Sequence, residues 1–586
     1  MNYPVWFLPE TGGGFLIALI SILHVFVSHF AVGGGLYLIY SEKKGLRENS
    51  QPILDFTKRH ARFFLLVTLV FGSISGVGIW FIISLVNPAA TSLLIHNFVF
   101  GWAAEWVFFT VEIAAAFVYF YMFGRMDSKT HLKVGWLYFI TAWMSLFLIN
   151  GIIGVMLTPG RWSENMNFWA GFFNPSFFPS LVFRTFIALM IAACYGFLSA
   201  SFTKDRDVRI AMTRFSAKWA LVTLVAAVFS GLWYLSVLPD QSHGLVMGKS
   251  PTIVGILPWF AGAVLSFLIV MLGAGILRPN YNLKPVAGLA MISALLIMGG
   301  FEWTREAARR PYVINEVMYS NGILKKDVEA LNQKGYLRTA LWVENREVSE
   351  GNLVAGGQEL FMHQCYSCHT VNGKNNDIIK ATSNMSYNAL VSYIRRIHEV
   401  RYFMPPFAGT ELESRALAVY IAGGLQGKDV QERPEEAGTS KNGAALFEEN
   451  CSSCHAVEDL TSAVDGVEID EIVGMLKNLN EISDEMEPLA GSEEDHVQLA
   501  SFLSKQNANT EEEAAINGAD VFDAHCTMCH GMPDMKEYTE NMDRQELFTL
   551  LGRLDQLQVG MPPFRGTEPE REALADFLES INKGGE

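Results

Sequence analysis

The first 300 positions of the chain alternate between long apolar runs and short polar connectors. A helix that crosses a bilayer needs roughly 20 predominantly apolar residues. Eight runs reach this length, at approximately 13–40, 63–87, 99–124, 133–157, 180–202, 216–240, 257–277 and 283–303. No apolar segment of comparable length follows them. The pattern predicts an all-α protein, with an eight-helix transmembrane bundle followed by a soluble tail.

Lysines and arginines gather in alternate connectors, and basic loops stay on the cytoplasmic side of a membrane. The first connector and every second one after it carry the basic residues Lys43, Lys44, Arg47, Lys58, Arg59, Arg62, Arg125, Lys129, Lys133, Lys204, Arg206, Arg209, Arg214, Lys218, Arg278 and Lys284. The other connectors hold only Arg161 and Lys249. Both ends of the bundle should therefore face outward (N-out, C-out). This orientation predicts an eight-pass protein of the bacterial inner (cytoplasmic) membrane with its tail in the periplasm.

The tail repeats one short motif three times, as CYSCH (365–369), CSSCH (451–455) and CTMCH (526–530). This is the attachment pattern of c-type haem, in which two thiols bind the porphyrin and the adjacent His ligates the iron. A single CxxCH also occurs in zinc sites or by chance, but here the flanks repeat as well. A Gly and a Phe precede each first Cys at steps of four: Gly357, Phe361; Gly443, Phe447; Gly518, Phe522. We expect three covalent haem c groups, held by Cys365, Cys368 and His369, by Cys451, Cys454 and His455, and by Cys526, Cys529 and His530.

Each motif is followed by a methionine in a similar context, MPPFAGTE from Met404, MEPLAGSE from Met486 and MPPFRGTE from Met561. A thioether opposite the His is a common second iron ligand and raises the potential of the haem. Eleven residues after the Gly of each stretch stands an aromatic that can pack on the opening helix: Tyr420, Phe502 or Phe577. The tail thus resembles three class I cytochrome c domains, at 351–427, 441–507 and 514–586. A connector, 326–350, joins them to the membrane domain, 1–325.

Charge is distributed unevenly along the chain. The formal net charge is −16, but residues 411–586 alone hold 38 Asp and Glu against 12 Lys and Arg. The acidic tail is either a solvated face that keeps an exported domain soluble or a docking surface for a basic partner. Its sign disfavours nucleic acid as a partner.

A few ionisable residues lie inside the apolar runs, where each costs roughly 2.5–3.5 kcal/mol at mid-bilayer and is therefore a site hypothesis. His24 and His29 lie in the first run and Glu105 and Glu112 in the third, two turns apart on nearly one helix face. Arg184 begins the fifth run. At the end of the eighth run stand Glu302, Arg305 and Glu306. Cys194, in the fifth run, is most simply a small buried residue.

Residues 10–325 resemble the first subunit of cytochrome bd oxygen reductases. The segments that carry the resemblance are LHVFVSHFAVGGG (23–35), AEWVFFTVEIAAAFVYFYMFGRMD (104–127), SLFLINGIIGVMLTPGRW (145–162) and EAARRPYVINEV (306–317). The resemblance implies two adjacent non-covalent b- or d-type haems in the membrane domain. It maps His24 and Glu306 onto haem-ligating positions and Arg309 onto a position that holds charge on a propionate or the bound haem. Glu105 and Glu112 match its two-glutamate helix, with a spacing of seven where eight is usual.

The chain departs from this family at two places. The connector PDQSHGLVMGKSPT (239–252) replaces the long external loop of quinol-oxidising members. Arg184 stands where the family has the His of its low-spin b haem, and the expected Met is missing from WFAGAVLSFLIV (259–270). A cationic Arg cannot ligate iron. That haem is therefore expected to be absent, and quinol oxidation is disfavoured.

These observations together predict a terminal respiratory oxidoreductase. Electrons would pass from a periplasmic cytochrome c or multi-haem donor through three c haems to a buried high-spin site that reduces oxygen to water, with protons arriving past Glu105 and Glu112. The alternatives are a reductase of nitric oxide or another small oxidant, and a non-catalytic electron-transfer subunit; further membrane subunits are compatible with each. Glu302 is a propionate neighbour, a proton carrier or an alternative ligand. His29, His60 and His96 stay unassigned, with a satisfied core histidine as the default for His29.

Overall fold

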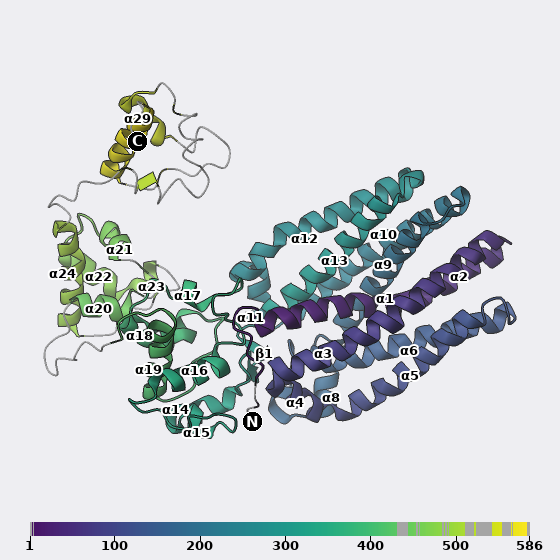
Figure 1. The fold of residues 1–586 in the computed structure, drawn as a ribbon, viewed down its shortest axis with the longest axis horizontal. Helices are drawn as coiled ribbons and strands as arrows, with labels where there is room; N and C mark the ends of the chain where they lie inside the picture. Colours follow the sequence, from purple (N-terminus) through teal and green to yellow (C-terminus); the bar gives the residue numbers. More distant parts are fainter. Residues whose placement is uncertain are drawn as a thin grey trace. The chain divides into compact units, whose positions relative to one another are not determined.

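The computed structural model describes residue 3, residues 5–430 and most of 443–582; the gaps within the last range are 453–454, 456, 483–485, 487–488, 490–491, 510–517, 519–520, 523–538, 540–541, 554–563 and 565–566. The chain forms two compact units, the first made mainly of residues 1–439 and the second of the remaining tail. Figure 1 shows a bundle of long helices followed by groups of short helices along the sequence. Each unit is described by itself.

The described residues contain eight helices that are long and apolar enough to cross a membrane, as the sequence predicts. Two of them continue through a π-helical turn, at Leu66–Gly72 and Met271–Leu277. Their segments are α1 (Gly13–Arg47), α2 (Gln51–Leu65) with α3 (Ser73–Val86), α5 (Val99–Tyr121), α6 (Ser128–Gly154), α9 (Phe177–Ser201), α10 (Arg206–Ser236), α12 (Pro251–Val270) and α13 (Lys284–Ala307). Short helices fill the connections: α4 (Pro88–Asn97), α7 (Trp162–Asn165), α8 (Phe168–Phe172) and α11 (Asp240–Gly244).

Several of these helices begin or end outside the apolar runs because polar residues complete them. Asp127 caps α6, where its carboxylate accepts a hydrogen bond from the Thr130 amide at 2.9 Å. Asp205 caps α10 in the same way and accepts from Asp207 and Val208. Caps of this kind satisfy amides that have no partner inside the helix. Hydropathy alone therefore underestimates the length of these helices.

Helix α9 lies at the centre of the bundle and packs against α1 and α10. Its most apolar window is 72% buried, against 11% for the span formed by α2 and α3. Small residues allow the close approach to α1: a Cβ on Gly33 would lie 2.1 Å from the Ala188 carbonyl oxygen. The residues Ala192, Ala193 and Cys194 of α9 are fully buried. The environment of Cys194 agrees with the expectation of a small core residue.

A short antiparallel hairpin follows the last membrane helix and is the one strand pair among the described residues. Its strands are β1 (Tyr312–Ile314) and β2 (Met318–Tyr319). Helices α14 (Val328–Lys334) and α15 (Tyr336–Thr339) lead into the first cytochrome-like domain. That domain contains α16 (Leu353–Gln364), α17 (Ile378–Ala381), α18 (Tyr387–Val400) and α19 (Glu411–Val419), which continues as a π-helical turn through Leu425. The hairpin is an addition to the predicted all-α fold.

The rest of the tail is also helical where the structure describes it. Its helices are α20 (Gly443–Asn450), α21 (Val457–Ala463), α22 (Ile469–Lys477), α23 (Leu479–Ile482), α24 (Glu493–Asn509), α27 (Arg544–Leu551) and α29 (Glu568–Asn582). Helices α22 and α24 pack together, as do α27 and α29. The structure thus shows helical domains after the bundle, in agreement with the prediction.

One helix crossing recurs in all three repeats. A Cβ on Gly357 would lie 2.0 Å from the Ala416 carbonyl oxygen and 2.7 Å from the Cβ of Tyr420. A Cβ on Gly443 would lie 2.2 Å from the Gln498 carbonyl oxygen and 2.3 Å from the Phe502 Cβ. A Cβ on Gly518 would lie 2.1 Å from the Ala573 carbonyl oxygen and 2.5 Å from the Phe577 Cβ. The repeated glycine is therefore where the opening helix touches the backbone of the closing helix. This crossing confirms the predicted packing of Tyr420, Phe502 and Phe577 against the opening helices.

We expect the substitution Gly443→Ala to destabilise the second repeat by about 1–3 kcal/mol, because the added methyl overlaps the Gln498 carbonyl. Hydrogen exchange of the α20 and α24 peptides, read by mass spectrometry in the full chain, measures this free energy locally. Gly474→Ala is the matched control, since Gly474 lies on α22 with open space around its Cα. An equal loss of protection in both variants would contradict the close crossing.

Candidate functional site

The first haem-attachment motif lies on a tight turn at the end of α16. The amides of Cys368 and His369 both donate to the Cys365 carbonyl, at 3.1 and 3.0 Å. Neither thiol is in a disulfide. The His369 Nδ1 atom bonds the Asn376 carbonyl at 3.0 Å, which orients the ring and leaves Nε2 available for iron. Burial lowers the pKa of His369, with the Asn376 carbonyl opposing the shift, so the neutral ligating form is favoured.

The segment that carries the predicted second ligand, Met404, is tied to the rest of the first domain. The ring of His398 donates from Nδ1 to the Met404 carbonyl at 2.7 Å. The Gln364 amide donates to the Ala408 carbonyl at 2.7 Å and accepts from its N–H at 3.0 Å. His398 and Gln364 thus position the methionine loop, and His369 and Met404 are the residues that would hold the iron of a haem c in this domain.

The second and third motifs are described only in part. The Cys451 amide donates to the Phe447 carbonyl at 2.8 Å, which matches the Cys365 to Phe361 bond of the first motif at 2.9 Å. His455 and Met486 are partly buried. The predicted ligands Cys454, Cys526, Cys529, His530 and Met561 lie outside the described residues.

In the bundle, the predicted ligand His24 lies on α1 and is partly buried. Its Nδ1 atom is 3.1 Å from the Ser75 hydroxyl on α3. A contact of this kind fixes the ring and leaves Nε2 as the ligating atom. The described residues contain no hydrogen bond or ion pair between His24 and Glu306. The predicted pair of ligands thus stays a prediction.

Two other bundle histidines have one nitrogen each without a partner. His29 Nδ1 bonds the Val25 carbonyl at 2.8 Å, and His60 Nδ1 lies 2.7 Å from the Ser199 hydroxyl. The Nε2 atoms of both rings are buried and make no hydrogen bond in the described part of the chain. Only one of the two ring nitrogens of His29 is therefore hydrogen-bonded among the described residues. The expectation of a core histidine with both nitrogens bonded is met only in part. A buried imidazole nitrogen of this kind can hold a water or an iron.

Glu302 is largely enclosed between two arginines, with 11% of its side chain exposed. Its carboxylate lies 2.9 Å from Arg184 Nη2 and 2.8 Å from Arg305 Nε. The Arg184 guanidinium also lies over the Phe301 ring, 5.5 Å from its centroid. The arginine that replaces the low-spin haem ligand of the resembled family thus has an ion-pair role in the core. The role of Glu302 as a cofactor ligand stays a prediction.

Glu306, one turn further along α13, has different surroundings. Its side chain is 55% exposed, against 11% for Glu302, and its carboxylate pairs with Arg309. Arg309 is buried and also donates from Nη1 to the Val313 carbonyl at 2.5 Å. Burial lowers the pKa of Arg309, and the neighbouring Glu306 carboxylate opposes this shift. Arg309 thus links the end of α13 to the hairpin that follows.

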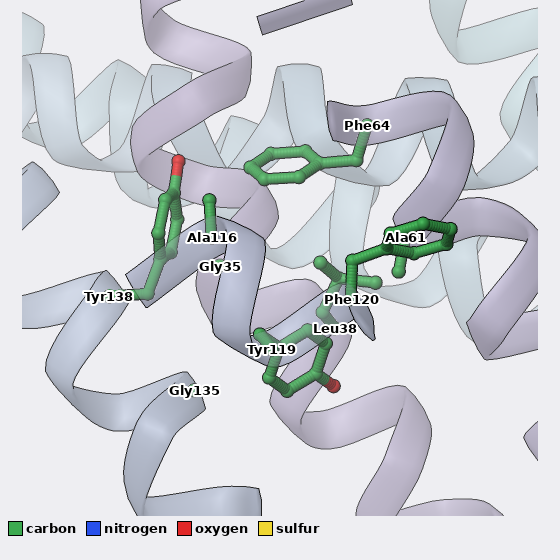
Figure 2. Close-up of a pocket in the computed structure, with 9 residues that line it drawn as sticks. All are labelled: Gly35, Leu38, Ala61, Phe64, Ala116, Tyr119, Phe120, Gly135 and Tyr138. Carbon is green, nitrogen blue, oxygen red and sulfur yellow. The ribbon is translucent and has the colours of Figure 1, made fainter. Parts of the chain in front are cut away.

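Of the two acids on α5, Glu112 accepts a hydrogen bond from the Tyr138 hydroxyl at 3.2 Å, and the same hydroxyl lies 2.8 Å from the Ala31 carbonyl. Glu105 is partly buried. Figure 2 shows Tyr138 at the edge of a small, mostly apolar cavity that Tyr119 also lines. Its volume of about 10 Å³ is close to the smallest space that holds one water.

Sequence reasoning missed a second polar group near this cavity. Glu42 is buried on α1 and accepts a hydrogen bond from the Tyr119 hydroxyl at 2.7 Å. Its other oxygen lies 2.8 Å from His131 Nδ1, and His131 Nε2 bonds the Tyr119 carbonyl at 2.8 Å. Glu42 and His131 stand at the polar ends of two runs, where charged residues are ordinary. The sequence therefore carried no signal for their pairing.

We expect Glu302→Gln to destabilise the bundle by about 3–5 kcal/mol, because the change leaves Arg184 and Arg305 buried without their anion. Adding Arg184→Met should restore part of the loss, since one uncompensated cation is removed. Thermal unfolding of the purified protein measures both variants. Glu48→Gln is the control, because its exposed pair with Lys44 is worth about 0–1 kcal/mol. A double variant no more stable than Glu302→Gln would contradict the ion-pair account.

Comparison with known proteins assigns the tail. The family model described as "Cytochrome C oxidase, cbb3-type, subunit III" matches residues 352–421, 438–503 and 513–578. Among solved structures, the bd oxidase from Geobacillus thermodenitrificans is similar to 53% of this chain over 90% of its own, with 16% sequence identity and a TM-score of 0.45. No curated protein matches the chain. The chain is a membrane protein of respiratory electron-transfer type, and its C-terminal region consists of three cytochrome c domains.

Proposed function

We propose that this protein is a terminal respiratory oxidoreductase of the bacterial inner membrane. It takes electrons from a periplasmic c-type donor, passes them through three c haems and delivers them to a buried site that reduces oxygen to water. The single observation that carries the proposal is one chain joining three cytochrome c domains to eight apolar helices with several buried ionisable residues. Such residues are costly in a membrane unless they serve a site.

Each candidate residue has a role in this proposal. His24 on α1 and Glu306 on α13 would hold a high-spin haem, and Arg309 pairs with the Glu306 carboxylate. When bound, a haem of this kind supplies an iron with an open position for oxygen. An ion-pair cluster lies near the end of α13 and consists of Glu302, Arg184 and Arg305. Glu105 and Glu112 carry the protons that oxygen reduction consumes, and Tyr138 positions Glu112.

The donor reaches the protein from the periplasmic side. The residues after 411 are strongly acidic, so a basic donor is attracted at long range. The short connector 239–252, which the structure folds as α11 and a π-helical turn, provides no large quinol-binding loop. A cytochrome c-type donor therefore replaces quinol.

One observation favours a second function, a non-catalytic electron-transfer subunit. Both acids at the end of α13 are engaged by arginines, Glu302 by two and Glu306 by one. A carboxylate held in this way is a weaker iron ligand than a free one. In this case the bundle would relay electrons to another subunit. Binding of carbon monoxide to the reduced protein separates the two functions, since a saturated relay shows no ligand-induced spectral change.

We expect His24→Ala and Glu306→Gln each to lower oxygen uptake by more than about a hundredfold, because loss of an iron ligand exceeds the 10–100-fold effect of losing an outer contact. Oxygen consumption by the purified full chain with ascorbate and an artificial c-haem reductant measures this. His96→Ala is the control, since His96 is on the exposed face of α4 and bonds Ser92. Undiminished uptake in the first two variants would rule out these ligands.

We expect the rate at which a basic cytochrome c reduces the covalent haems to fall as ionic strength rises, because salt screens the attraction of this donor to the acidic tail. Stopped-flow reduction at several salt concentrations gives the rate. An acidic cytochrome c is the control and should show the opposite slope. Equal slopes for both donors would argue that the tail charge serves solubility alone.

A further inference from the structure

The first cytochrome c domain is joined to the segment that precedes α1. The Val371 amide donates to the Pro9 carbonyl at 2.8 Å, and the Leu8 amide donates to the Tyr366 hydroxyl at 2.6 Å. The Phe7 ring packs edge-on against Tyr366 with centroids 4.8 Å apart. Tyr366 belongs to the haem-attachment motif itself. The chain that leads into the helix with His24 thus forms part of the wall of the first haem domain.

The same domain also meets the hairpin that follows α13. The Cys368 sulfur lies 3.9 Å from the Ser320 hydroxyl, and the His398 ring lies edge-on to Tyr319 at 6.1 Å. These contacts involve one haem thiol and the residue that holds the methionine loop. The haem-attachment edge of the first domain therefore faces the end of the membrane bundle.

Two tyrosines span the hairpin between these parts. The rings of Tyr312 and Tyr319 are stacked, with centroids 4.8 Å apart and planes inclined by 17°. Tyr312 lies three residues after Arg309 in the chain, and Arg309 pairs with Glu306. Tyr319, on the other strand, touches His398. The stacked pair therefore links the first haem domain, through His398, to the segment that follows α13.

Charge distinguishes the first domain from the other two. Residues 351–427 hold 5 acidic and 6 basic residues. Residues 441–507 hold 15 acidic and 3 basic residues. Residues 514–586 hold 14 acidic and 6 basic residues. A nearly neutral domain suits a fixed contact with its own chain, whereas strongly acidic domains attract a soluble donor.

From these contacts we infer that the first cytochrome c domain is the fixed exit of the tail, and that electrons enter the bundle from it across the Tyr312–Tyr319 pair. The second and third domains receive electrons from the donor. Each event moves one electron: the first domain's haem is oxidised and the buried centre is reduced, with no bond formed or broken and neither tyrosine oxidised. This inference rests on the proposed function and adds the order of transfer and the contact that carries the last step.

The test compares Met404→His with the matched change Met561→His in the haem-loaded full chain. A second histidine lowers the potential of a haem relative to His and Met. The full chain is mixed rapidly with a reductant under anaerobic conditions. Absorbance at separate wavelengths follows the covalent c haems of the tail and the non-covalent haem of the bundle, here called the removable haem. We expect Met404→His to slow reduction of the removable haem at least about tenfold after the other covalent haems are reduced. Met561→His should instead slow the reduction of the covalent haems, which precedes that last step.

A pair of hairpin variants isolates the contact. Tyr319→Leu should slow the same step, whereas Tyr319→Phe keeps the stacked ring and should keep the rate. Covalent haem content and the first domain's haem spectrum are measured in both variants, so that loss of folding is recognised. Equal rates in Tyr319→Leu and the parent protein would overturn the tyrosine contact. A last step slowed by Met561→His and not by Met404→His would overturn the first domain as the exit.

The outcome is independent of whether oxygen is the oxidant. Anaerobic electron transfer through the first domain without oxygen uptake would remove the proposed oxygen reductase and leave this inference standing. If the protein takes up oxygen but its removable haem is reduced at the same rate with and without Met404, the proposed oxygen reductase stands and this inference falls. Hydrogen exchange adds a third readout: the Leu8 and Val371 amides should be protected, and fast exchange at both would overturn the fixed docking.

Discussion

A carboxylate enclosed among membrane helices is stabilised by a neighbouring cation, and Glu302 has two. The Arg184–Glu302–Arg305 cluster lets three charges lie inside an apolar bundle, because each is within ion-pair distance of an opposite charge. It also joins α9, the most buried helix of the bundle, to the end of α13. The positions of Glu306, Arg309 and the hairpin after them follow from this anchoring. The arginine that stands where the resembled family has its low-spin haem ligand is the same group that pairs with Glu302 near the end of α13.

The tail follows a different constraint, the close contact of two helix backbones. Gly357, Gly443 and Gly518 each leave room for a carbonyl of the closing helix, and an aromatic on that helix covers the contact. This crossing sets the position of the CxxCH turn, which begins eight residues, or about two helical turns, further along the chain. Three copies of one packing solution therefore give three haem domains, whose surfaces have diverged in charge.

Much of this organisation could be predicted from the sequence, because it depends on local patterns. Run length gives the eight spans, and the spacing of Gly, Phe and Cys gives the repeats. The partners of Arg184 and His131 could not be predicted, since they lie on helices distant in sequence and each pairing is one among many. The same holds for the contact of Pro9 with Val371 and for the half-satisfied ring of His29. The roles of His24 and Glu306 depend on a resemblance and stay proposals.

The strand-like contact between residues 8–9 and residues 366–371 has a consequence for biogenesis. Those two segments are separated by the whole bundle, so the first haem domain can close only after all eight spans have been threaded into the bilayer. Tyr366 lies between the two attachment cysteines, and its hydroxyl accepts a hydrogen bond from the Leu8 amide. The haem-attachment motif of the first domain is thereby coupled to the part of the chain that leads into the first membrane helix.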